Sequence, residues 1–94
     1  MADESGQVAN AGAAKVSPLS AVVEVVARAL VDHPDAVKVR ESTRRGMTIV
    51  ELTTAPGDMG KIIGRQGRTA AALRTLVSVA AERHGVRAQL DIRD

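Results

Sequence analysis

The chain contains no aromatic residue: among its 94 residues there is no Phe, Tyr or Trp. Cys is absent as well, so the apolar 45% of the sequence consists of Ala, Val, Ile, Leu and Met alone, and any core must be aliphatic. Binding modes in which nucleotide bases stack on aromatic side chains are therefore excluded. Disulfides, thiolate nucleophiles and Cys-based zinc sites are excluded too.

The length and charge of the chain are typical of one soluble domain. Thirteen Lys and Arg oppose 11 Asp and Glu, a formal net charge of +2. The longest apolar stretches fall far short of the ~20 residues that cross a bilayer, so no membrane contact is expected. Asp3 and Glu4 occupy the region where a secretory signal carries positive charge. The sequence predicts a cytoplasmic protein.

The chain divides into two parts at Ser17. Residues 1–17 are small and polar and lack any period that could bury a face, which predicts a flexible tail. Residues 18–94 are predicted to form the folded domain. Ser17 and Pro18 are a favoured cap and first residue of a helix. Apolar residues then recur at helical spacing, namely Leu19, Val22, Val23, Val26 and Leu30. This helix must end before Pro34.

The rest of the domain alternates between strand and helix periodicity. We expect strands at 36–43, 47–53 and 86–92, a turn at 44–46, and helices at 56–63 and 68–84. Asp58 is placed to favour the positive end of the first of these helices, and Gly85 is the expected left-handed cap of the second. The fold class is α+β in the order helix, strand, strand, helix, helix, strand. The helices should cover one face of a three-stranded sheet and leave the other face open.

The segment from Gly60 to Thr69 has the features of an anion-binding site. Gly64 and Gly67 lie between two predicted helices, where a tight turn needs positive φ and room for another chain to approach. The second helix begins at this turn, so its unpaired N–H groups and the positive end of its dipole face outward. Four basic residues and no acidic residue occur from 59 to 81. The small net charge therefore conceals a basic patch.

The motif Ile-Ile-Gly-Arg-Gln-Gly-Arg at residues 62–68 resembles the GXXG loop of a KH domain, which clamps the backbone of four nucleotides. The order of elements resembles the bacterial, type II arrangement of that domain. Together with Leu-Val-Asp-His-Pro at residues 30–34, the motif resembles the KhpA family of small bacterial single-KH proteins. The resemblance covers residues 18–93. It implies three partners: single-stranded RNA, a second copy of the chain, and a larger KH-containing protein. The implied role is post-transcriptional regulation or RNA chaperoning.

The resemblance also implies a set of RNA-binding residues. These are Lys61, Ile62, Ile63, Gly64, Arg65, Gln66, Gly67 and Arg68. The two glycines shape the loop, and Arg65 and Gln66 contact the sugar–phosphate backbone. The flanking Lys and Arg add positive charge. The two isoleucines anchor the short helix, and one of them lines the nucleotide groove. The opposite wall of this groove is expected from Ile49 or Val50 in the second strand.

Other classes of function have weaker support. No carboxylates are paired by spacing, and His33 and His84 sit at helix ends, where structural roles are expected. We therefore predict no enzymatic activity, no metal and no cofactor. One alternative is a helix-turn-helix DNA-binding protein that uses residues 68–84 for recognition. Against it, the Ala-rich start of that helix offers few side chains that read bases. Another alternative is a protein-interaction module that binds no nucleic acid.

The helix at residues 68–84 also predicts self-association. Its segment 76–81 is apolar nearly all round, which is more than one contact with a sheet requires. A chain this short, without aromatic bulk, would gain stability from burying more area. We therefore predict a homodimer around this helix.

Four cations near the loop predict a log–log salt slope for RNA binding no steeper than about −3, and hence weak binding by one loop.

Overall fold

The computed structural model describes residues 17–94, and its elements follow the predicted order. The helices and strands are α2 (Pro18–Leu30), β2 (Lys38–Arg44), β3 (Met47–Thr53), α3 (Met59–Ile63), α4 (Arg68–Arg83) and β4 (Arg87–Arg93). Three 3₁₀ turns lie between them, η1 (Pro34–Ala36), η2 (Pro56–Asp58) and η3 (Arg65–Gly67). The tail predicted at residues 1–17 lies outside the described residues, apart from Ser17.

Helix α2 starts where its sequence signals predict. The Ser17 hydroxyl accepts a hydrogen bond from the backbone N–H of Ser20 at 3.3 Å, and Pro18 is the first helical residue. The helix ends at Leu30, a few residues before the proline that was expected to stop it, because Val31 is already extended. Pro34 instead opens the turn η1, which takes in Ala36 and moves the start of β2 to Lys38.

The three strands form one mixed sheet in the order β2-β3-β4. Strand β2 pairs antiparallel with β3 across a turn at Arg45 and Gly46, whereas β3 and β4 run parallel. The connection from β3 to β4 passes through α3 and α4. Strand β3 is therefore the central strand, paired along both edges, and β2 and β4 are the edge strands.

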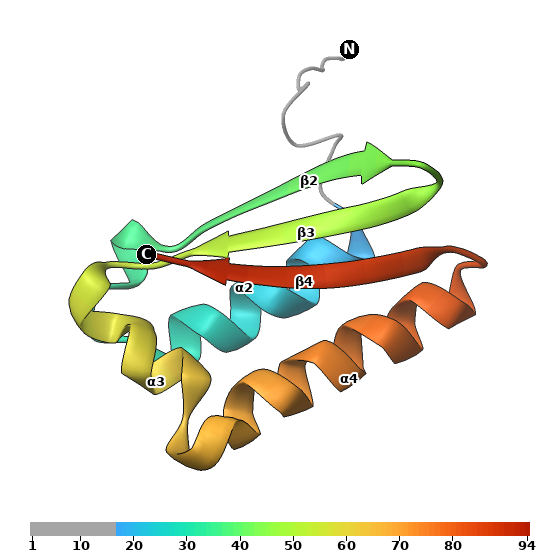
Figure 1. The fold of residues 1–94 in the computed structure, drawn as a ribbon. Coiled ribbons are helices and arrows are strands. Elements are labelled where there is room, and N and C mark those ends of the chain that lie inside the picture. Colours follow the sequence, from blue (N-terminus) through green and yellow to red (C-terminus); the bar gives the residue numbers. More distant parts are fainter. Residues whose placement is uncertain (1–16) are drawn as a thin grey trace, which may run out of the picture.

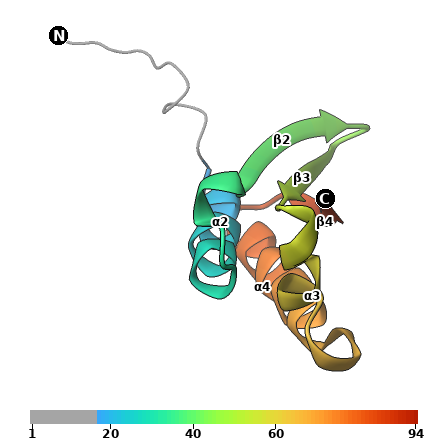
Figure 2. The same cartoon turned by 90° about the vertical axis from the view of Figure 1, so that its left-hand side faces the viewer.

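Helices α2, α3 and α4 lie on one face of the sheet, as predicted (Figures 1 and 2). Helix α2 packs on β2 and β3, and α4 packs on β4 and α2. The largest fully buried apolar side chains are Leu52, Ile62, Leu73, Val23, Val50 and Val77. This core is purely aliphatic, and none of the elements at residues 17–94 covers the opposite face of the sheet.

Helix α4 ends at a left-handed glycine, as expected. Gly85 has φ of +70°, and the N–H groups of Gly85 and Val86 donate to the carbonyls of Glu82 and Ala81. These bonds satisfy carbonyl groups at the end of the helix. Within residues 17–94, no helix combines the length and the apolar character that crossing a bilayer requires.

Candidate nucleic-acid interface

Four residues, Gly64 to Gly67, reverse the chain between α3 and α4. Gly64, Gln66 and Gly67 have φ of +76°, +58° and +74°. The Gly67 N–H donates to the carbonyl oxygen of Gly64 at 3.1 Å, and the Arg68 N–H donates to that of Arg65. The turn is therefore closed by its own backbone, and α4 starts directly after it.

The two glycines are required for different reasons. A Cβ on Gly64 would lie 2.2 Å from Oγ1 and 2.7 Å from Cβ of Thr69, so a side chain has no room there. A Cβ on Gly67 would meet nothing within 4 Å, so this position needs glycine only because of its positive φ. The open space at Gly67 leaves the backbone accessible to another chain.

The loop forms a tip that projects from the end of the α3–α4 pair, away from the sheet (Figures 1 and 2). Arg65, Gln66 and Arg68 are exposed there, while the two glycines are half-buried. The Arg68 guanidinium donates from Nη2 to Oε1 of Gln66 at 3.0 Å, which holds the two side chains together. Two arginines thus lie beside the amino end of a 16-residue helix, where positive charge from the backbone dipole is also concentrated.

Lys61 is only partly available to this surface. Its Nζ lies 3.2 Å from Oδ2 of Asp32 and 4.0 Å from Oδ1 of Asp58. These carboxylates lie near the ends of α2 and η2 and compensate part of the ammonium charge. Lys61 therefore adds less positive charge to the loop than Arg65 and Arg68 do.

The isoleucine pair has divided roles. Ile62 is 0% exposed and belongs to the core cluster, so it anchors α3 and has no surface to offer a ligand. Ile63 is half-buried and is the member of the pair that can line a groove. The sequence analysis predicted that the two isoleucines anchor the short helix and that one of them lines the groove, but it did not indicate which one.

The predicted opposite wall is wrong. Val50 is 0% exposed, and Ile49 lies on the other face of the central strand, away from the helices. Both edges of β3 are already paired, so its backbone groups are not available. The edge strand beside α4 is β4, and its position depends on the parallel pairing with β3, which periodicity alone does not reveal.

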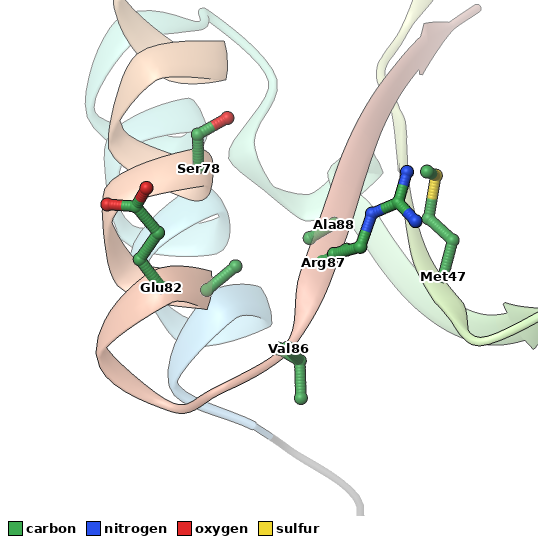
Figure 3. Close-up of a pocket in the computed structure, with 7 residues that line it drawn as sticks. Met47, Ser78, Glu82, Val86, Arg87 and Ala88 are labelled. Carbon is green, nitrogen blue, oxygen red and sulfur yellow. The ribbon is translucent and has the colours of Figure 1, made fainter.

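A shallow groove lies between α4 and β4. It consists of two pockets that share Met47, Ser78 and Ala88. The rest of its lining is Arg74, Ala81, Glu82, Val86, Arg87, Gln89 and Leu90. Figure 3 shows Ser78 and Glu82 on α4, with Val86, Arg87 and Ala88 across from them at the start of β4. We call this the α4–β4 groove. Its lining is mixed, because the apolar residues Met47, Ala81, Val86, Ala88 and Leu90 stand beside the polar or charged residues Arg74, Ser78, Glu82, Arg87 and Gln89.

Asp58 lies at the start of α3, where it was expected, but its side chain does not cap the helix. It occupies the N-cap position of α3 but makes no capping hydrogen bond. Its carboxylate, 1% exposed, instead accepts hydrogen bonds at Oδ2 from the backbone N–H of His33 at 3.0 Å and from His33 Nδ1 at 3.1 Å. Burial raises the pKa of Asp58, but the hydrogen bonds from His33 outweigh this effect, so the pKa lies below its ordinary value.

The contact explains the structural role expected of His33, and it ties the end of α2 to the start of α3. Sequence spacing could not reveal it, because the two residues are 25 positions apart. Among residues 17–94, no group of three or more His, Asp or Glu side chains could hold a metal ion.

An α+β domain with a three-stranded mixed sheet, helices on one face and a Gly-Arg-Gln-Gly turn between two of them is a KH domain of type II. The comparison with protein families agrees, since residues 20–92 match the model of the KhpA/KhpB KH domain. The chain belongs to this family. Membership in this family, whose relatives are named RNA-binding proteins, agrees with the prediction of a non-enzymatic protein.

The relatives resemble the chain over nearly all of their own lengths. The "RNA-binding protein KhpA" of Halalkalibacterium halodurans is 50% identical over 76 residues, which are 81% of this chain and 100% of that protein. The protein of the same name from Caldanaerobacter subterraneus is 51% identical over 71 residues, 76% of this chain and 95% of the relative. The one from Aquifex aeolicus is 40% identical over 77 residues, 82% and 98% of the two chains.

Proposed function

We propose that this protein binds single-stranded RNA through the loop Gly64 to Gly67 and the adjoining α4–β4 groove, without base stacking on aromatic rings. The folded unit is the KH domain at residues 18–94, and it acts in the cytoplasm. The observation that carries the proposal is the geometry of the loop. Its backbone is open at Gly67, and it is flanked by exposed Arg65 and Arg68 at the start of α4. Similar relatives are named RNA-binding proteins.

The groove supplies the second half of the site. Met47, Val86 and Ala88 supply apolar side chains against which bases can lie, beside the polar Ser78. Arg74, one of the cations expected near the loop, lines the same groove. An RNA chain whose phosphates are held at the loop can therefore continue between α4 and β4. KH loops clamp four nucleotides, so one such site binds weakly.

Weak single sites favour a dimer. The two neighbouring helices α2 and α4 expose large aliphatic side chains on their outer surface, namely Val25, Leu30, Leu76 and Val79. Leu76 and Val79 are 47% and 51% exposed, and both belong to the helix for which self-association was predicted. A second copy, or a larger KH-containing protein, would bury this outer helical surface and link two loops, which raises the effective concentration of the second site. A protein of this kind would act as a post-transcriptional regulator or RNA chaperone.

The test reverses the charge of the loop with the double variant Arg65→Asp, Gln66→Asp. Asp is among the residues that best tolerate the positive φ at position 66, so folding should be preserved. We expect RNA affinity to fall by at least about tenfold, because cation–phosphate contacts supply most of the binding. Fluorescence anisotropy with an unstructured oligoribonucleotide measures the affinity, and circular dichroism checks helical content and melting.

The matched control is Arg28→Asp, Ala29→Asp on the exposed side of α2, which changes the net charge by the same amount. This control should retain most of the affinity. If the loop variant binds RNA as well as the unmodified chain does, the assigned site is wrong.

The helix-turn-helix alternative does not describe this fold. The inner face of α4 packs through Leu73 and Val77 into the core beside β4, and the chain has a three-stranded sheet. A competition experiment gives a direct check: duplex DNA should not displace single-stranded RNA at equal nucleotide concentration. The interaction-module alternative would be supported if crosslinking in cells recovered no RNA above background.

A further inference from the structure

The open face of the sheet carries an uneven distribution of charge. The register places 12 side chains on this face, in four rows across the three strands. The rows are Lys38–Thr53–Arg93, Arg40–Glu51–Asp91, Ser42–Ile49–Gln89 and Arg44–Met47–Arg87. The five cations are all exposed, whereas the two carboxylates are half-buried. The face is therefore more positive toward a ligand than its composition suggests.

The acidic residues are concentrated in one row. Glu51 lies 3.5 Å from the Arg93 guanidinium and is directly opposite Arg40. The row formed by Arg44, Met47 and Arg87 is separated from the acidic row by a neutral one. Neither arginine of that row forms an ion pair with another residue in the described part of the chain. The least compensated charge thus lies at the end of the sheet nearest the β2–β3 turn.

This end of the open face is continuous with the α4–β4 groove. Met47, Arg87 and Gln89 line the groove and also belong to the open face. In Figure 3, Ala88 points toward α4, whereas Arg87 points to the other side of β4, beside Met47. An RNA chain that leaves the groove across the free edge of β4 therefore meets Arg87 first.

Charge inside the groove directs a polyanion along this path. Arg74 lies in the part of the groove nearer the loop, and Glu82 lies at the far end. The carboxylate of Glu82 repels a phosphate that continues along α4. The Arg87 guanidinium attracts the same phosphate on the opposite side of β4. The two effects favour a turn from the groove onto the sheet.

We propose that the open face of the sheet is a second RNA-contacting surface, which binds the phosphates of nucleotides beyond those held by the loop. The inference rests on the proposed function, because the loop must position the strand first. Four nucleotides fill the loop site, so only a longer RNA reaches the sheet. With no aromatic side chain in the protein, the contacts are electrostatic and independent of sequence.

The experiment compares Arg40→Gln, Arg44→Gln, two exposed cations of the open face that do not line the α4–β4 groove, with the matched control Arg28→Gln, Arg83→Gln, which removes the same charge from the helices. Each protein is titrated with an oligouridylate of four nucleotides and with one of twelve. The sheet variant should bind the twelve-nucleotide RNA about tenfold more weakly than the control does, with a salt slope shallower by about 1.4, and should bind the short RNA as the control does. Thermal melting establishes that both variants are folded.

Three outcomes separate the two proposals. Equal affinity of the sheet variant and the control for the long RNA would overturn the sheet proposal. The same result is expected if a long RNA only bridges two loops, or if the open face of the sheet binds a protein partner instead. Equal loss of both RNA lengths in the sheet variant would overturn it as well. Failure of the unmodified chain to bind either RNA would instead refute the proposed function.

Discussion

Single residues set the geometry of the α3–α4 loop. The Gly-Arg-Gln-Gly sequence contains two glycines, but only Gly64 faces a neighbour, Thr69, across a distance that excludes a side chain. Gln66 adopts a positive φ without being glycine. Gly64 is thus required both for its backbone conformation and for its contact with Thr69, whereas Gly67 is required for its backbone conformation alone.

Alanine substitution should reveal the additional steric requirement at Gly64. Gly67→Ala is expected to lower the free energy of unfolding by about 1–2 kcal/mol, the cost of a left-handed backbone in a residue with a Cβ. Gly64→Ala should cost more, because the new Cβ also collides with Thr69. Chemical denaturation measures both variants. Equal losses at the two positions would contradict the steric argument.

Asp58 is the one buried ionisable side chain in the described part of the chain, and His33 holds it charged. Its pKa is lower in the folded protein than in the unfolded chain, so the unfolded chain binds the proton more readily. The stabilisation is complete above the ordinary Asp pKa of about 3.9 and is lost as the pH falls through the lower folded value.

Asp58→Asn should therefore lower the melting temperature at neutral pH, and the difference from the unmodified protein should shrink as the pH falls from about 6 to about 3. Thermal unfolding across this range tests the prediction. The control is Asp35→Asn, an exposed carboxylate in the same region, which should give a small difference at every pH. A difference for Asp58→Asn that does not change with pH would mean that folding does not lower the pKa of the Asp58 carboxyl.

At the scale of elements, α4 has a different role on each of its sides. Its inner face, with Leu73 and Val77, packs into the core, and its first turn adjoins the loop Gly64 to Gly67. Ser78 and Glu82 line the α4–β4 groove on one flank. Leu76 and Val79 are exposed outside the groove. This division explains why the helix is apolar over more of its circumference than a single contact with the sheet needs.

A charge on the outer helical surface should prevent self-association. At a protein concentration of roughly tens of micromolar, we expect the unmodified chain to be a dimer and Leu76→Asp to be a monomer. The variant should not associate because burying a carboxylate without a partner is costly. Light scattering measures the mass. Ala71→Asp, an exposed position on α4 outside this surface, should remain dimeric. A monomeric unmodified chain at this concentration would remove the dimer proposal.

At the scale of the whole molecule, the arrangement of charges determines how strongly salt weakens RNA binding. The sequence predicts four cations near the loop and a slope no steeper than about −3. In the structure, Lys61 is paired with Asp32, which leaves Arg65, Arg68 and Arg74 for a short RNA. A four-nucleotide RNA should therefore show a slope of about −2. Affinities measured from about 50 to 200 mM salt give the slope, and a value steeper than −3 would mean that further cations contact even the short strand.

Much of this protein was predictable because local signals agree with one another. Helical spacing in α2, alternation in β4 and the glycine at position 85 each predict an element or its end, and the structure confirms them. The glycines of the loop also follow from local geometry. Strand and helix ends shifted by one or two residues where Pro34 starts a short turn instead of simply ending a helix.

The sequence by itself determined the elements, their order and the position of the loop, because these depend on backbone preferences and periodicity within short segments. The tertiary structure decided which strand borders the groove, which carboxylates hold Lys61 and His33, and which charges share the open face of the sheet. Those features arise when β4 pairs in parallel beside β3 and when residues 25 positions apart come together at Asp58. No local pattern encodes such contacts, since they depend on the packing of the whole domain.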